Sequence, residues 1–129
     1  MKRGQALVEV ALVLPIVFAL ALGAVSIVRL ADARAGIDAA TAAAASAAAR
    51  APDPTTAVSQ GGAAFAAAAA GYALGDPRLT LDLGTFSRGS TIHAYGTATV
   101  AMAAPVPGLP RGVTLTSTAA ARVESWRSR

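Results

Sequence analysis

The pattern of apolar and polar positions divides the chain into two parts. Residues 10–28 form a run of 19 residues without a charge, which is long enough to cross a bilayer as a helix. Beyond residue 77 apolar and polar side chains alternate one by one, which is typical of half-buried strands. We therefore expect a helical N-terminal part and a strand-rich C-terminal part.

The apolar run favours membrane insertion. Twelve of its residues are Leu, Ile, Val or Phe, and together they gain roughly 4–7 kcal/mol at mid-membrane. Glu9, at the edge of the run, costs at most about 3 kcal/mol, and less where it reaches the interface. The gain therefore exceeds the cost, and insertion is favoured. Glu9 is an acid that would be stabilised by a cationic partner. A cleaved secretory signal is the alternative, although its apolar core is usually only about 7–15 residues long.

Helical sequence continues well past the apolar run. From Gln5 to Arg50 the one strong helix breaker is Pro15, which should kink the membrane portion mildly. The residues after 28 are rich in alanine, the best helix former, and the prolines in the segment 51–54 end the helix. Such a helix is about 69 Å long, much longer than a bilayer is thick. Its second half must therefore protrude and find a partner surface.

A second helix and a small sheet are expected to follow. Asp53 is the expected N-cap of a helix over residues 54–70, with Pro54 at its first position. Three alternating segments then predict antiparallel strands, with apolar positions at 79–83, 92–102 and 113–123. The predicted fold class is α+β: a long N-terminal helix, transmembrane in its first half, and a second helix packed on a three-stranded antiparallel sheet.

Composition removes several function classes. The chain has 129 residues, a net charge of +4, one histidine and no cysteine. A metal site needs three or four converging ligands, so we expect no metal and no cofactor. The scattered cations and few aromatic residues give nucleic-acid binding little support. A triad of Ser87, His93 and Asp82 is conceivable, but no nucleophile elbow surrounds the serine. We therefore expect that the protein is not an enzyme.

The start of the chain resembles a known family. Gly4-Gln5 followed by Glu9 looks like the processing signal of type IV pilins and pseudopilins. The longer pattern over residues 3–15, with the alanine-rich extension to residue 50, is similar to TadE-like minor pilins of tight-adherence (Flp) pili. The resemblance implies a cut between Gly4 and Gln5 by a prepilin peptidase. It departs from many type IV pilins at Gln5, where they place phenylalanine.

The cut would leave a free amine that Glu9 can neutralise. Gln5 would become the new N-terminus, and Glu9 could pair with the corresponding amine of a neighbouring subunit, since such pairing is strong at low dielectric. The other interpretation is a glutamate that simply reaches the interface, aided by the positive end of its helix. Ala19 and Gly23 form a small-xxx-small pair that would let another helix approach, and a similar small-residue ladder runs from Gly36 to Ala48.

Together these features predict a structural component of pilus assembly. The expected divisions are a leader at 1–4, a transmembrane helix at 5–29, its extramembrane continuation at 30–51 and an extracytoplasmic head at 52–129. The expected partners are the membrane, other pilins or pseudopilins, the pilus assembly platform and prepilin peptidase, with no nucleic acid. The leader of pilin-like proteins is cut on the cytoplasmic side, so the resemblance implies a cytoplasmic N-terminus in the inner membrane. A membrane-anchored binding module without processing, or a cleaved secreted domain, remains the alternative.

Overall fold

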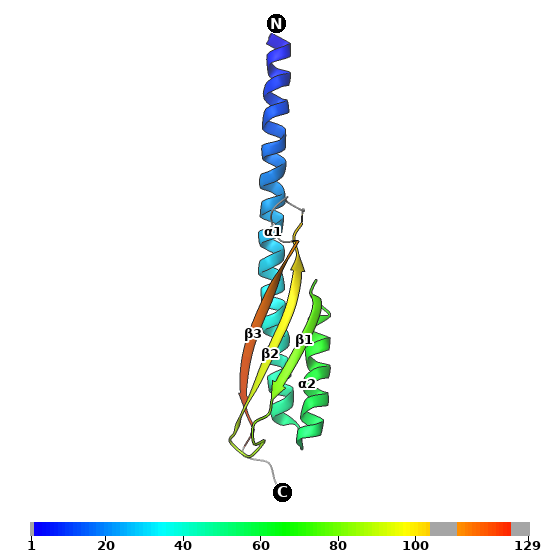
Figure 1. Cartoon of the computed structure of the whole chain (residues 1–129), viewed down its shortest axis with the longest axis vertical. Helices are drawn as coiled ribbons and strands as arrows, with labels where there is room; N and C mark the ends of the chain where they lie inside the picture. The colour runs from blue at the N-terminus through cyan, green and yellow to red at the C-terminus, as the bar shows by residue number, and fades with distance from the viewer. Residues whose placement is uncertain (1, 104–110, 125–129) are drawn as a thin grey trace.

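A single long helix forms the axis of the molecule. The computed structural model describes residues 2–103 and 111–124, and in it helix α1 runs from Lys2 to Arg50. Its N-terminal half stands free, and its C-terminal half lies beside all the other elements (Figure 1). Arg50 lies in the last turn, where a cation interacts favourably with the helix dipole. The predicted long helix is confirmed, with its start at Lys2 rather than at Gln5.

Helix α2 spans Pro54–Ala69 and begins as its sequence predicts. Asp53 is extended, and its carboxylate accepts hydrogen bonds from the Thr56 amide at 2.9 Å and from the Thr56 hydroxyl at 2.6 Å. This satisfies one of the amide groups left free at a helix start. The helix ends one residue before the predicted Ala70, whose amide still donates to the Ala66 carbonyl at 3.0 Å.

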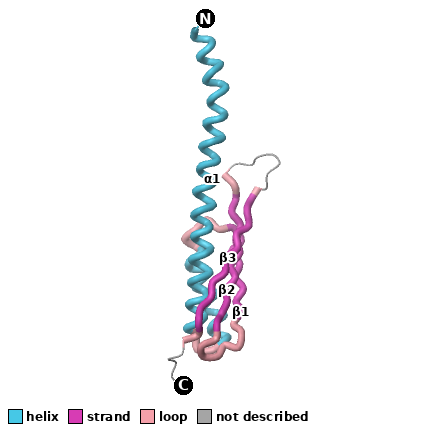
Figure 2. Tube along the Cα trace, turned by 90° about the vertical axis from the view of Figure 1, so that its left-hand side faces the viewer, coloured by secondary structure: helices cyan, strands magenta, loops and turns pink. Residues whose placement is uncertain are grey.

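Three antiparallel strands form one sheet in the order β1-β2-β3. They are β1 (Gly75–Asp82), β2 (Thr91–Ala101) and β3 (Gly112–Arg122). Along the central strand β2, alternate residues are buried, so one face of the sheet is covered by the helices and the other faces outward (Figure 2). The predicted α+β class is therefore confirmed. Strand β2 ends at Ala101 rather than at Met102.

The first strand begins earlier than the alternation of leucines indicated. Strand β1 starts at Gly75 and includes Pro77, and its register shifts between Gly75 and Arg78. A proline is tolerated here because β1 lies at the edge of the sheet, where a missing amide breaks no ladder. Asp76 forms an ion pair with Arg78 at 2.8 Å. This hydrogen-bonded pair raises the pKa of Arg78 above its usual value.

The core is built mainly from small side chains. Ala40, Ala44 and Ala48 on α1 are fully buried, and they belong to the ladder that the sequence offered as a helix-packing surface. The ladder is used inside this chain. A Cβ at Gly61 of α2 would lie 3.3 Å from the Ala44 carbonyl oxygen, and Gly36 faces the ring of Tyr72. The two helices therefore approach closely.

Strand β2 also lies very close to α1. Gly96 is buried, and a Cβ built on it would overlap the hydroxyl of Thr41 and lie 3.1 Å from Ile37 Cδ1. Thr41 is itself fully buried and donates to the Ile37 carbonyl at 2.7 Å. Ile37 and Phe65 are the large side chains of this cluster. Gly96 thus sets the distance between helix and sheet.

Candidate membrane and assembly segment

The N-terminal half of α1 is an apolar rod without a covering partner in the described chain. Its large apolar side chains between Leu7 and Val28 are 42–72% exposed. They occupy all sides of the helix, and none of this stretch is buried. A helix that is apolar all round belongs in a buried or membrane setting. By length and composition, α1 is able to cross a membrane.

The burial of α1 changes abruptly where its sequence changes. The first buried residue is Ala33, and Ile37 follows it in the core. From there to Arg50 one side of α1 packs on α2 and on the sheet. The same helix therefore has an exposed apolar half and a half that is integral to the head.

The predicted processing and pairing residues lie together at the free end of the rod. Gly4, Gln5 and Glu9 are all exposed and lie within the helix. A Cβ added at Gly4 would meet nothing within 4 Å. In the described chain Glu9 makes no hydrogen bond or ion pair, and it borders a shallow hollow of otherwise apolar side chains that includes Ala6, Val10 and Val13. A carboxylate in these surroundings is available to a group from outside the chain.

The remaining predicted residues of the rod lie further along it. Helix α1 is continuous through Pro15, whose ring nitrogen cannot donate to the Ala11 carbonyl; the mild kink stays a prediction. Ala19 and Gly23 are exposed, and a Cβ at Gly23 would meet no other atom within 4 Å. This small-residue pair contacts nothing in the described chain, so it is open to another helix.

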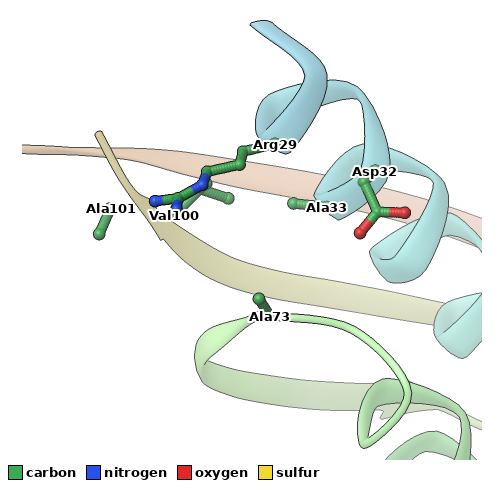
Figure 3. A pocket seen from close by; sticks show the side chains of 6 residues that line it. All are labelled: Arg29, Asp32, Ala33, Ala73, Val100 and Ala101. Carbon is green, nitrogen blue, oxygen red and sulfur yellow. The ribbon is translucent and has the colours of Figure 1, made fainter. Parts of the chain in front are cut away.

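A cavity of about 340 Å³ lies where the free half of α1 meets the head. Arg29, Asp32 and Ala33 of α1 line it together with Ala73, Val100 and Ala101 (Figure 3). The local sequence pattern assigned no site role to Arg29 or Asp32. Their position in the sequence could have drawn attention to them, because they are the first charged residues after the apolar run.

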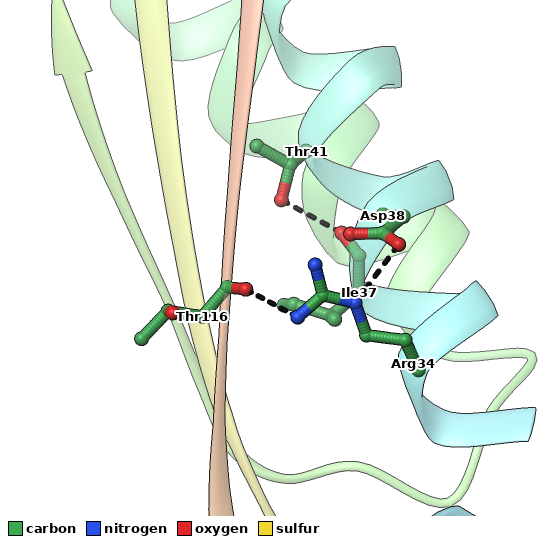
Figure 4. A network of polar contacts seen from close by, with 5 residues as sticks. All are labelled: Arg34, Ile37, Asp38, Thr41 and Thr116. Atoms are coloured by element: carbon green, nitrogen blue, oxygen red, sulfur yellow. Dashed lines mark hydrogen bonds and ion pairs between the residues drawn. The ribbon is translucent and has the colours of Figure 1, made fainter. Parts of the chain in front are cut away.

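The next charged pair along α1 ties the helix to the sheet. Arg34 Nε lies 3.1 Å from Asp38 Oδ2, and both side chains are about half exposed. Residues four apart on a helix lie on the same face, where such a solvated pair can form. Arg34 also donates to the Thr116 carbonyl of β3 at 2.8 Å (Figure 4). It thereby satisfies the outward carbonyl of Thr116 at the edge of the sheet. This contact could not be predicted from the sequence, because the two residues come together only in the folded chain.

The structure does not assemble the conceivable catalytic triad. Asp82 and His93 are neighbours across β1 and β2, but Asp82 accepts from the Gly84 amide at 3.0 Å. The ring of His93 stacks on the ring of Tyr95, with 6.4 Å between the two ring centroids. Ser87 shares a hydrogen bond with the Thr85 hydroxyl at 3.0 Å. Within residues 2–103 and 111–124, no three His, Cys, Asp or Glu side chains gather as metal ligands.

The comparison with protein families bears on α1 alone. Residues 4–50 match the family model of the TadE-like proteins, and this confirms the predicted resemblance over that segment. No curated protein and no solved structure matches the chain. The TadE-like family is a structural family of Tad pilus systems rather than an enzyme family. The match thus shows that residues 4–50 are similar to this family, and the other elements lie outside the matched segment.

Proposed function

We propose that this protein is a TadE-like minor pilin or pseudopilin that helps initiate or support a Flp-type pilus. Residues 5–29 span the inner membrane, the N-terminus is cytoplasmic and the head lies outside. The observation that carries the proposal is the division of α1. One helix combines an exposed apolar half, with a lone acid near its start, and a second half that holds a folded head. The match over residues 4–50 covers both halves.

Processing prepares the N-terminus for assembly. Prepilin peptidase cuts between Gly4 and Gln5, which removes Lys2 and Arg3 and exposes the amine of Gln5. Within one helix Gln5 and Glu9 lie about 6 Å apart along the axis. Pairing of Glu9 with the Gln5 amine of the next subunit therefore staggers neighbouring helices by about this distance. Low dielectric makes the attraction strong, and the pairing sets the register of the bundle.

The protein then acts by offering a ready helix to the pilins. The rod supplies apolar surface on all sides, and Ala19 and Gly23 allow a neighbouring helix to approach closely. The head stays at the membrane surface as the contact for other pilins and the assembly platform. A filament that begins on such a helix needs fewer subunits to come together at once, which lowers the cost of initiation.

Replacement of Glu9 tests the pairing. The Glu9→Ala chain should still insert, because it removes a charge from the rod, yet its co-purification with pilins should fall at least about tenfold through loss of a low-dielectric ion pair. Val10→Ala is the matched control, since it shortens the adjacent side chain and keeps the acid. Unchanged recovery of pilins with Glu9→Ala would refute the pairing.

The intact mass of the membrane-extracted protein separates three classes of protein. A chain that lacks residues 1–4 supports a processed pilin-like protein. A full-length or merely Met-trimmed chain supports an anchored binding module without processing. A chain that has lost the whole apolar run would instead indicate a secreted domain.

A further inference from the structure

Two opposite charges at the base of the head lack partners within the described chain. Arg29 and Asp32 lie three residues apart on α1, a spacing at which a cation and an acid can pair on one face of a helix. Neither forms a hydrogen bond or an ion pair with any residue of 2–103 or 111–124. The neighbouring pair Arg34 and Asp38 does, at 3.1 Å. With respect to the described residues, Arg29 and Asp32 are thus available to an external ligand.

Both side chains line the same cavity, which has an apolar floor. The floor is Ala33, 3% exposed, and Val100, 5% exposed. In Figure 3 the Arg29 side chain extends towards Val100 at the end of β2, whereas the Asp32 carboxylate lies on the other side of Ala33. The volume of about 340 Å³ lies in the range of small-ligand pockets. The cavity is therefore lined by a cation and an anion on opposite sides of apolar surface.

The position of the cavity relative to the apolar run suggests the ligand. This step rests on the proposed function, in which residues 5–29 span the membrane. The run of 19 residues is about 28 Å long as a helix, close to the roughly 30 Å of hydrocarbon in a bilayer. Arg29 follows directly and so lies at the level of the lipid phosphates. Asp32 lies about 4.5 Å further from the hydrocarbon.

We propose that this cavity binds the head group of a phospholipid that carries a phosphate and a primary amine, as in phosphatidylethanolamine. The Arg29 guanidinium donates to the phosphate oxygens, for which its planar fork is well suited. The lipid ammonium donates to the Asp32 carboxylate. The order of charges matches, because the phosphate is attached nearer the acyl chains and the amine lies beyond it.

The same geometry disfavours the other common head groups. A phosphatidylcholine head group has no N–H donor for Asp32. A phosphatidylglycerol head group has no cation, so its binding leaves Asp32 unpaired beside an anion. The bound ethanolamine lipid gives the base of the head a second attachment to the bilayer. It thereby holds the head in one orientation relative to the membrane.

The test uses the full chain in detergent and short-chain lipids. Binding of dihexanoyl phosphatidylethanolamine, phosphatidylcholine and phosphatidylglycerol is measured by native mass spectrometry. We expect the ethanolamine lipid to bind roughly tenfold more tightly than either of the others, as for one additional hydrogen bond to a charged group. Arg29→Gln should weaken binding of all three lipids, because each carries the phosphate. Asp32→Asn should abolish the preference for ethanolamine over choline.

Arg122→Gln is the matched control, since it removes an exposed cation from the far end of β3. Equal binding of the three lipids by the unaltered chain, or equal effects of Arg29→Gln and Arg122→Gln, would overturn the proposal. Carbonate extraction of cell membranes is done in parallel. A chain released by carbonate contradicts the membrane-spanning role itself, whereas a retained chain without head-group preference contradicts only the lipid site.

Discussion

Individual small residues determine how closely the parts of this molecule approach. Gly96 on β2 faces the hydroxyl of Thr41, and no side chain fits between them. The alanines of α1 have the same role towards α2. Packing to native density leaves no room for an added methyl group at such positions. The stability of the head therefore depends on residues that contribute little apolar area themselves.

Gly96→Ala is expected to destabilise the head by about 1–3 kcal/mol, because overpacking displaces the helix from the sheet. Thermal or denaturant unfolding of the full chain in detergent measures the change. Thr41→Ala removes the overlapping hydroxyl, so the double variant should recover more than half of the loss. Simple additivity of the two single effects would show that the contact does not set the spacing.

The helices and strands follow from local signals to very different degrees. The N-cap at Asp53 and the alternation of β2 can be predicted from short stretches of sequence, and the structure confirms both elements. The start of β1 cannot be predicted in this way, because Pro77 is acceptable only at a sheet edge. The order of strands decides which strand lies at the edge. The contact of Arg34 with Thr116 joins residues far apart in the chain, so spacing on the helix alone predicts only the pair with Asp38.

Two adjacent glycines of α2 provide a test of helix packing. Gly61→Gln places a side chain against Leu81 of β1 and the Ala44 carbonyl of α1, so we expect a loss of about 1–3 kcal/mol. At Gly62 an added Cβ meets nothing within 4 Å. Gly62→Gln should be neutral or stabilise by up to about 0.5 kcal/mol through higher helix propensity. Unfolding followed by circular dichroism compares the two, and equal effects would contradict the close approach of the helices.

At the scale of the whole molecule, the two halves of α1 differ in their surroundings: the first is exposed and the second is part of the head. Every buried residue of the described chain lies at or after Ala33, and the rod before it contributes none. The head therefore has its own core, with the second half of α1 as part of it. The apolar rod is exposed along its length and takes no part in that core.

Removal of residues 1–28 should leave a soluble, folded head. We expect circular dichroism of the shortened chain in plain buffer to show helix and strand with cooperative unfolding, because no core side chain is lost. The full chain should require detergent, since its rod exposes a continuous apolar surface. A shortened chain that is unfolded, or a full chain that stays monomeric in water, would contradict this division.

The sequence by itself determined the apolar rod, the acid at its edge, the N-cap of α2 and the alternation of the strands, because each depends on residues close together in the chain. The resemblance over residues 4–50 likewise rests on a local pattern. Only the tertiary structure decided that the small-residue ladder packs within the head and that Arg29 and Asp32 border one cavity. The physical reason is that close packing and shared cavities depend on segments that the chain brings together only when it folds.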